Sequence, residues 1–376
     1  MQKIRYFDHA ATTAVNEEVI NKMFPYFSIN YGNPSSIYSI GRRNKKVIEE
    51  QRENVAKALN AVSKEIYFTS CGSESDNLAI KGICYANKNK GNHIITSKIE
   101  HPAVLNTCRI LEKEGFEVTY LNVDKNGIIN LEELENSIKG STILISIMFA
   151  NNEIGTIEPI KEIGEIAKRK NVYFHTDAVQ AVGNVKIDVK KLKIDLLSMS
   201  AHKFYGPKGV GALFVREGVN FNKIQDGGHQ EKDKRAGTEN VAGIVGLGEA
   251  IKLSYNNFDF YNNKIKNLRD YYIEEVKKNL IDIKINGDIN KRLPGNSNIS
   301  FRGIDGEELL LKLDELRHMC FNRFGMFIRL IRTITCFSSY RITKRISLWF
   351  TKSNIWNRKY KRRCRFPRRK FNKNSK

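Results

Sequence analysis

Short apolar runs alternate with amphipathic stretches from about residue 60 to residue 216. The runs are rich in β-branched and aromatic residues, and they lie at residues 65–68, 93–96, 117–120, 142–146, 172–174 and 211–215. Between some of them, stretches such as residues 160–169 repeat apolar positions every three and four residues, which predicts helices. This rhythm predicts an α/β domain around a largely parallel sheet. Because ligands bind such sheets where strands end and helices begin, the loops after the strands should carry the chemistry.

A second, smaller α/β region is expected from about residue 256. It begins with a charged helix around residues 267–278 and continues with a strand at 297–301 and a helix at 306–316. After Leu316 the pattern degrades. We therefore divide the chain into an N-terminal segment (1–14) that packs with the smaller domain, a large domain (15–255), the start of the smaller domain (256–316) and a tail (317–376). The tail is not expected to be natively folded.

The formal net charge of +22 is concentrated in this tail. Residues 317–376 hold 19 of the 63 lysines and arginines and no acidic residue, which leaves 44 bases against 41 acids in the preceding 316 residues. Such asymmetry excludes a description of the whole protein as basic.

The sequence favours a reduced, cytoplasmic protein. The N-terminus lacks the apolar core of a signal peptide, and no apolar run approaches the length of a membrane span. The six cysteines show neither CxxC spacing nor the density of a secreted disulfide framework. The seven histidines do not cluster with cysteines at zinc spacing, so no metal site is expected.

Residues 198–209 (SMSAHKFYGPKG) are the most informative segment. They place Lys203 between an apolar strand and a Gly/Pro-rich turn. Partial desolvation at a strand end favours the neutral amine that Schiff-base chemistry requires. A solvated surface lysine is the ordinary alternative.

Three other segments strengthen this interpretation. Asp177 follows an apolar strand, where a carboxylate pairs with a protonated pyridine nitrogen or simply caps a helix. The small residues Gly72 and Ser73 lie between a strand and a helix, where backbone N–H groups bind phosphate or close a turn. His101 precedes a proline, where it either stacks on an aromatic cofactor or caps a loop.

Together these residues resemble the cysteine desulfurases of the class V aminotransferase superfamily, which depend on pyridoxal 5′-phosphate (PLP). The resemblance covers residues 1 to about 316 and includes residues 6–13 (YFDHAATT), 32–36 (GNPSS), 151–155 (NNEIG) and 235–240 (RAGTEN). It implies the type I fold of PLP-dependent transferases, with a mostly parallel seven-stranded sheet and a smaller α/β domain. It also implies a homodimer that removes sulfur from L-cysteine and passes it to an iron-sulfur scaffold or another acceptor protein.

The resemblance also assigns roles to individual residues. Lys203 binds the cofactor covalently and moves protons at the substrate α-carbon, Asp177 pairs with the pyridine nitrogen, and His101 stacks on the ring. The remaining contacts fall into two groups. Asn152 and Gln180 contact the side of the ring that bears its oxygen, and the phosphate is held by Gly72, Ser73, Ser200 and His202, with Thr238 reaching the phosphate in the partner subunit.

The nucleophile of the family is missing from this chain. A loop like ICASxGSACSSG should follow residues 306–314, and a later GSLR should supply the arginine that binds the substrate carboxylate, but neither is present. The codons of Met326-Phe327, read from their second base, give cysteine whatever codon encodes phenylalanine. Met319-Cys320 gives a second forced cysteine seven positions earlier, as the family pattern requires. We infer a one-base frameshift near Leu316, and we expect this chain to be impaired because Cys320 is not a positioned substitute.

Two alternatives remain at this stage. Another class V enzyme, such as a selenocysteine lyase or an aminotransferase, shares much of the pattern, although residues 8–13 and 235–238 favour a desulfurase. The tail clusters at 359–363 and 368–370 could bind nucleic acid through phosphates. The frameshift accounts for them without a partner, because AGA AGA becomes GAA GAA one base later, so no specific nucleic acid is expected.

Overall fold

The computed structural model describes residues 4–256, 258–323 and 332–337. These described residues belong to one compact unit. The helices are α1 (Glu17–Met23), α2 (Pro25–Ser28), α3 (Ser39–Leu59), α4 (Gly72–Ala86), α5 (Pro102–Lys113), α6 (Leu131–Asn136), α7 (Ile160–Arg169), α8 (Gln230–Asp233), α9 (Val241–Asn256), α10 (Phe258–Asn279) and α11 (Gly306–Glu315), with short 3₁₀ turns η1 (Ser63–Glu65) and η2 (Ala201–Lys203). The basic clusters at 359–363 and 368–370 and the codon positions 326–327 lie outside the described residues.

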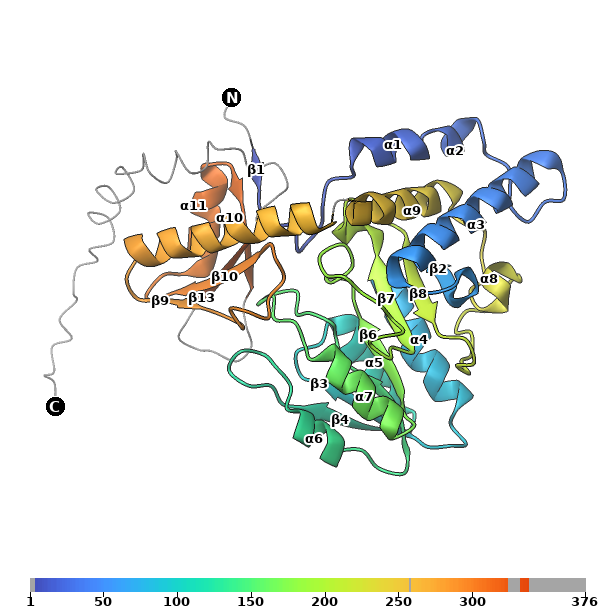
Figure 1. The fold of residues 1–376 in the computed structure, drawn as a ribbon, viewed down its shortest axis with the longest axis horizontal. Coiled ribbons are helices and arrows are strands. Elements are labelled where there is room, and N and C mark those ends of the chain that lie inside the picture. The colour runs from blue at the N-terminus through green and yellow to red at the C-terminus, as the bar shows by residue number, and fades with distance from the viewer. Residues whose placement is uncertain (1–3, 257, 324–331, 338–376) are drawn as a thin grey trace, which may run out of the picture. The chain divides into compact units, whose positions relative to one another are not determined.

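The largest sheet in the described part of the chain has seven strands (Figure 1). In spatial order they are β2 (Ile66–Thr69), β8 (Gly211–Val215), β7 (Leu196–Ser200), β6 (Tyr173–Asp177), β5 (Thr142–Ser146), β3 (His93–Ser97) and β4 (Glu117–Leu121). Among these strands, β8 alone runs in the direction opposite to the others. The predicted α/β fold with a mostly parallel seven-stranded sheet is confirmed.

Helices cover both faces of this sheet, because its central strands are apolar on both sides. Ile94 and Leu196 pack in one core cluster with residues of α4 and α5, whereas their neighbours Ile95 and Leu197 pack in the other cluster with residues of α3, α7 and α9. Side chains alternate between faces along a strand, so strands buried on both faces read as continuous apolar runs. That is why the sequence showed them so clearly.

The predicted amphipathic helix at residues 160–169 is α7. Its buried residues include Ile160, Ile163 and Ile166, which share one face at three-residue spacing. Figure 1 shows α3 and α9 lying side by side, and their contacts confirm this packing. Within the described residues, every helix is too short or too polar to cross a membrane.

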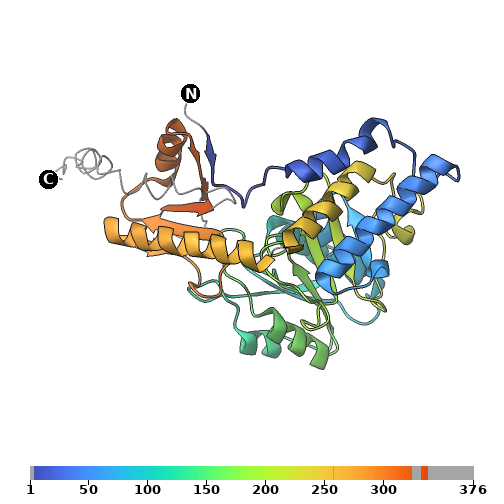
Figure 2. The ribbon, with the colours of Figure 1, turned by 45° about the horizontal axis from the view of Figure 1, so that its top comes forward.

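A second sheet lies in the smaller α/β region. Its strands pair in the order β12 (Phe321–Arg323), β13 (Arg332–Phe337), β10 (Asn296–Phe301) and β9 (Ile283–Ile285), and Figure 2 shows the long helix α10 running beside it. Near the N-terminus, β1 (Arg5–Tyr6) pairs in parallel with β11 (His318–Met319). The division at residues 14, 255 and 316 stays a prediction.

Candidate functional site

The residues singled out by the sequence gather at one edge of the large sheet. Strands β3, β5, β6 and β7 run parallel, and β2 runs with them because β8 is antiparallel to both β2 and β7. Their carboxyl ends therefore meet at the same edge, where loops and helix N-termini bind ligands in α/β sheets. Most of the predicted residues follow these strands: Gly72 and Ser73 after β2, His101 after β3, Asn152 after β5, Asp177 and Gln180 at the end of β6, and Ser200, His202 and Lys203 at the end of β7.

Lys203 ends the turn η2, directly after β7, and its side chain is half-buried. Its Nζ donates hydrogen bonds to the carbonyl oxygens of Ala10 and Ala11, the latter at 3.0 Å. Burial lowers the pKa of the Lys203 amine below its ordinary 10.5, while Asp8 and Asp177 oppose that shift. A smaller free-energy cost of deprotonation makes this amine a better nucleophile toward an aldehyde near neutral pH.

Asp177 is the last residue of β6 and is 6% exposed. Its Oδ1 accepts a hydrogen bond from the Val179 N–H at 2.9 Å. The carboxylate closes a turn after the strand, and no helix begins there, so the alternative prediction of a helix cap is not met. Burial raises the pKa of the Asp177 carboxyl, whereas that N–H and the charges of His101 and Lys203 lower it. A cationic ring nitrogen placed against this carboxylate would supply the charge partner that burial demands.

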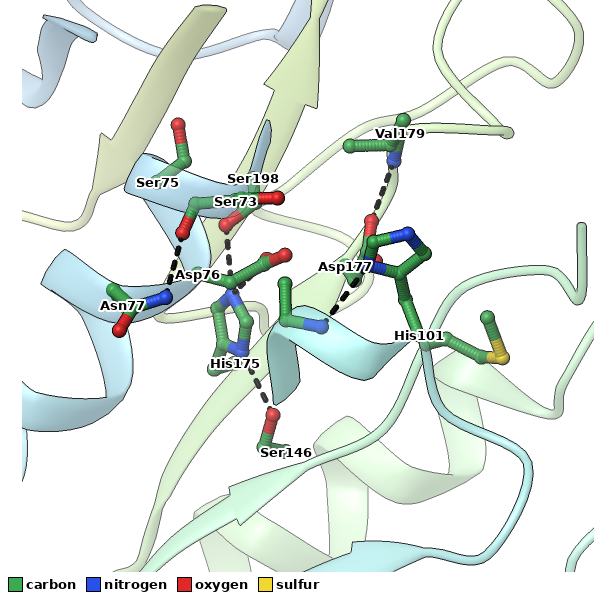
Figure 3. A network of polar contacts seen from close by, with 12 residues as sticks. Ser73, Ser75, Asp76, Asn77, His101, Ser146, His175, Asp177, Val179 and Ser198 are labelled. Atoms are coloured by element: carbon green, nitrogen blue, oxygen red, sulfur yellow. Dashed lines mark hydrogen bonds and ion pairs between the residues drawn. The ribbon is translucent and has the colours of Figure 1, made fainter. Parts of the chain in front are cut away.

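His101 is the N-cap of α5, and its Nδ1 accepts the Ala103 N–H at 3.1 Å. The ring is exposed and stands beside Asp177 (Figure 3). Ligand atoms of Asp76, His101 and Asp177 all lie within 4.8 Å of one another, a spacing that could also hold a metal ion. An aromatic cation also fits this space, because the His101 ring offers a surface for stacking and the Asp177 carboxylate offers an ion partner.

The N-terminus of α4 presents backbone N–H groups of the kind that bind phosphate in other proteins. Gly72 and Ser73 begin this fifteen-residue helix, whose first backbone N–H groups have no partner within the helix. A Cβ on Gly72 would meet Val179 Cγ2 at 2.6 Å and Ser200 Cβ at 3.6 Å. The glycine thus lets the helix end approach the strand ends β6 and β7 closely.

His202 lies in the same turn η2 as Lys203. Its Nδ1 lies 3.1 Å from Thr12 Oγ1, and its backbone oxygen accepts from the Thr13 N–H at 2.9 Å. Burial, followed by the charges of Lys203 and Lys208, lowers the pKa of His202 to about 4. His202 is therefore a neutral hydrogen-bonding group at pH 7 rather than a cation.

Three predicted residues remain: Gln180, Asn152 and Thr238. Their contacts within the single chain say less about a role in binding the cofactor. Gln180 Nε2 donates to Ala10 O at 3.1 Å, which ties the β6 turn to the same backbone segment that Lys203 contacts. Asn152 is half-buried in the loop after β5. Thr238 is exposed on the loop before α9. Its neighbour Arg235 contacts Glu74 of α4 at 2.8 Å, so this loop is anchored close to the phosphate-binding helix end.

The cysteines of the described residues differ in their burial and in their place in the fold. Cys84 and Cys108 are fully buried, and burial raises the pKa of Cys108 to about 12. Cys71 is the half-buried N-cap of α4. Cys320 is half-buried between β11 and β12.

Two carboxyl groups of the site were missed by the sequence analysis. Asp8 interacts electrostatically with Lys203, and its Oδ1 accepts the Ala11 N–H at 3.2 Å. Asp76 lies in α4, one turn from the helix start, and is 1% exposed. Position alone gave no signal for Asp76, because an aspartate in a helix is usually solvated. Asp8 was quoted as part of a motif, but nothing in the sequence placed it against Lys203.

Comparisons with known proteins agree with this geometry. The chain matches the family described as aminotransferase class-V over residues 5–322. It is 60% identical over 316 residues to a "Cysteine desulfurase IscS" of Clostridium botulinum, an alignment that covers 84% of this chain and 80% of that protein. It is 58% identical over 312 residues to a protein of the same name from Methanosarcina thermophila, covering 83% and 77% of the two chains.

Solved structures show the same similarity. A "NifS-like protein" superposes with a TM-score of 0.89 and 35% identity, over 93% of this chain and 98% of that chain. A structure described as "SspA in complex with cysteine" superposes with a TM-score of 0.74 and 36% identity, over 85% and 90%. The family match ends at residue 322, close to Leu316, where the sequence pattern degrades.

Proposed function

Because the chain belongs to the class-V aminotransferase family, we propose that it is built to act as a PLP-dependent cysteine desulfurase. The observation that carries the proposal is the convergence of Lys203, Asp177 and the N-terminus of α4 at one sheet edge. An amine of lowered pKa, a buried carboxylate and a row of helix N–H groups match the aldehyde, ring nitrogen and phosphate of PLP in turn. The substrate would be L-cysteine, as the names of the relatives state for those proteins.

PLP would supply an electron sink that stabilises negative charge at the substrate α-carbon. Within the chain, Lys203 would hold the cofactor and move the proton at that carbon. Asp177 would keep the ring nitrogen protonated, and His101 would orient the ring. Gly72, Ser73, Ser200 and His202 would bind the phosphate, with Asn152 and Gln180 beside the ring oxygen. In a family member that keeps the nucleophilic loop, an enzyme thiolate would attack the substrate sulfur. The bond between that sulfur and the substrate β-carbon would break with its electron pair left on the carbon fragment. Protonation of that fragment would release L-alanine and leave a persulfide on the enzyme.

We further propose a homodimer in which residues 20–40 contribute to the interface. Large apolar side chains are exposed throughout this segment, which runs from α1 through α2 and the loop after it to the start of α3: Ile20, Phe24, Phe27, Ile29, Tyr31, Ile37, Tyr38 and Ile40. Soluble monomers rarely expose so many neighbouring apolar side chains, and such patches mark interaction sites. The exposed Thr238 would reach the phosphate in the partner subunit. The persulfide sulfur would pass to an iron-sulfur scaffold or another acceptor.

Desulfuration by this exact chain should fail because the thiolate and the carboxylate-binding arginine are missing from its sequence. We attribute their loss to a one-base frameshift near Leu316. Binding of PLP should survive, since all its proposed ligands precede Leu316.

The experiment that tests the function titrates PLP into the full-length apoprotein and follows the visible absorption band of bound PLP. Wild type and the Lys208→Ala control should both develop the band, because Lys208 is an exposed lysine of the same loop. Lys203→Ala should not. With L-cysteine, the wild-type chain should produce alanine only at the background rate. A wild-type protein that never forms the band would overturn the cofactor assignment, and a band retained in Lys203→Ala would overturn the assignment of Lys203.

A further inference from the structure

A row of buried polar side chains lies near Asp177, on the face of the sheet that α4 covers. Side chains alternate along each strand, and this places Ser146 of β5, His175 of β6 and Ser198 of β7 on that face. Figure 3 shows His175 between the two serines, with Asp76 beside it. His175 Nδ1 lies 2.9 Å from Ser146 Oγ, and Nε2 lies 2.9 Å from Ser198 Oγ.

His175 provides no positive charge for Asp76. Burial lowers the pKa of His175 to about 3, and both ring nitrogens already have hydroxyl partners. Its Nε2 is 3.7 Å from Asp76 Oδ1, which is too long for a hydrogen bond. Asp76 Oδ1 is itself a buried atom without a hydrogen-bond partner. An ionised carboxylate in this position would leave a bare charge in a dry environment.

The other titratable groups facing Asp76 make ionisation still less favourable. Asp177 on β6 acts on it as a negative charge, and Glu100 in the loop after β3 and Cys71 at the start of α4 would act in the same direction once ionised. A hydrogen bond from Ser198 acts in the opposite direction. Burial is the largest cause, and it raises the pKa of Asp76 well above its ordinary 3.8. Burial also raises the pKa of Glu100 to about 8.

Asp177 is the better place for the negative charge of the pair. It accepts the Val179 N–H at 2.9 Å, and both His101 and Lys203 favour its ionised form. Two neighbouring buried carboxyl groups cannot both ionise cheaply, so the charge settles on the one with more donors and cations. Asp76 Oδ1 has no such N–H donor, and the charge of Lys203 acts on Asp177, although His101 lies within 4.8 Å of both carboxyl groups.

We propose that Asp76 is a positioning residue that carries a proton in the folded protein, so that the negative charge facing the cofactor's ring nitrogen resides on Asp177. The part that concerns the ring nitrogen rests on the proposed function. The protonated state of Asp76 concerns the apoprotein alone. Asp76 then acts through Asp177 and does not touch the cofactor or substrate.

The first test compares the melting temperature (Tm) of full-length apoprotein and Asp76→Asn between pH 5.5 and 8.5. Asp76 ionises near pH 4 in the unfolded chain and keeps its proton in the folded one. Wild-type stability therefore falls as pH rises from about 4 to the raised pKa of the folded state. Asparagine has no such proton to release, so the Tm of Asp76→Asn relative to wild type should increase by about 3 °C or more across this range.

A second test measures PLP affinity through the absorption band. Asp76→Asn mimics the neutral acid and should keep affinity within about threefold of wild type, whereas Asp76→Glu, which forces a longer acid into the same space, should lose about tenfold or more. Glu158→Gln is the matched control. Glu158 is also a buried carboxyl, with a pKa raised to about 7, and its Oε2 accepts the Ile129 N–H at 3.1 Å. The Tm of Glu158→Gln relative to wild type should rise with pH up to about 7 and then level off, without a change in PLP affinity.

The two tests separate the inference from the proposed function. If wild type binds no PLP, the proposed function fails, and the Tm comparison still decides the state of Asp76. Suppose that PLP binds, but the Tm of Asp76→Asn relative to wild type stays constant with pH or increases toward acid pH. Asp76 is then ionised in the folded protein, and the inference is overturned. A loss of PLP affinity in Asp76→Asn as large as in Asp76→Glu would overturn the positioning role.

Discussion

Arg52 of α3 and Glu231 of α8 form a buried ion pair with two parallel hydrogen bonds. Arg52 Nη1 and Nη2 lie 2.7 and 2.9 Å from the two carboxylate oxygens of Glu231, and both side chains are at most 4% exposed. Glu231 also accepts the Phe68 N–H of β2 at 2.8 Å. The backbone of Glu231 has a φ of 43°, a left-handed conformation that costs a non-glycine residue energy. The ion pair therefore holds a strained loop against the sheet.

Breaking this pair should strongly destabilise the fold. Glu231→Ala leaves the Arg52 guanidinium buried without its partner, and we expect the free energy of unfolding to fall by about 3–5 kcal/mol. Glu217→Ala is the matched control, because its ion pair with Lys64 is exposed; it should cost less than about 1 kcal/mol. Urea unfolding of the full-length apoprotein measures both. An equal loss of unfolding free energy in the two variants would show that the buried Arg52–Glu231 pair stabilises the fold no more than an exposed pair does.

Phe27→Asp should weaken the proposed dimer. Phe27 is 66% exposed on α2 within the apolar segment 20–40, and a carboxylate there would have to be desolvated in the interface. We expect the dimer to dissociate at concentrations about tenfold higher or more than for wild type. Ile281→Asp, at a site that is 91% exposed before β9, is the control and should leave the dissociation constant unchanged. Analytical ultracentrifugation measures the two. A wild type that is monomeric at every concentration contradicts the dimer itself.

The sequence predicted the framework of the site better than its interior. Strands and the helix α7 were found because their apolar positions follow simple periods. Asp76 was missed because its burial depends on three strands that bring His175 and Ser198 beneath α4, and no local pattern encodes that neighbourhood. The place of Asp8 against Lys203 likewise depends on a contact between residues far apart in the chain. Such tertiary contacts override local propensity.

Removing Asp8 should make Lys203 react at lower pH. The charge of Asp8 favours the ammonium form of Lys203 and opposes the lowering of its pKa by burial. In Asp8→Asn the pKa of Lys203 should fall further, so the midpoint of the pH dependence of PLP uptake should move toward acid by about 0.5–1 unit. The initial rate of band formation between pH 6.5 and 10 measures this. Asp226→Asn, a change at an exposed loop residue, should leave the midpoint in place; a shift toward alkaline pH in Asp8→Asn would contradict the assignment.

Gly72→Ala should weaken PLP binding through a clash with Val179. The added Cβ would lie 2.6 Å from Val179 Cγ2, and the stiff β-branched side chain cannot rotate away freely. Displacing the start of α4 should lower PLP affinity by about tenfold or more, since phosphate binding depends on the position of its N–H groups. Adding Val179→Ala to this variant should restore most of the affinity. Gly140→Ala is the control, because a Cβ there meets nothing within 4 Å; a double variant no better than Gly72→Ala alone would refute the clash.

Restoring the reading frame should restore desulfuration. If a single base was gained or lost near Leu316, the gene read in the adjacent frame encodes cysteine across Met326-Phe327 and a loop like ICASTGSACSSG over residues 318–330. It also encodes an acidic C-terminal helix in place of the basic tail, whose charge of +19 would then have no role in recognition. A gene corrected by one base should yield a protein that converts L-cysteine to L-alanine at least about a hundredfold faster than the present chain, because it regains a positioned thiolate.

A further Cys→Ser change at the restored loop cysteine should abolish that gain, whereas Cys320→Ser in the present chain should change nothing. The absence of any such loop in the adjacent frame would exclude the frameshift.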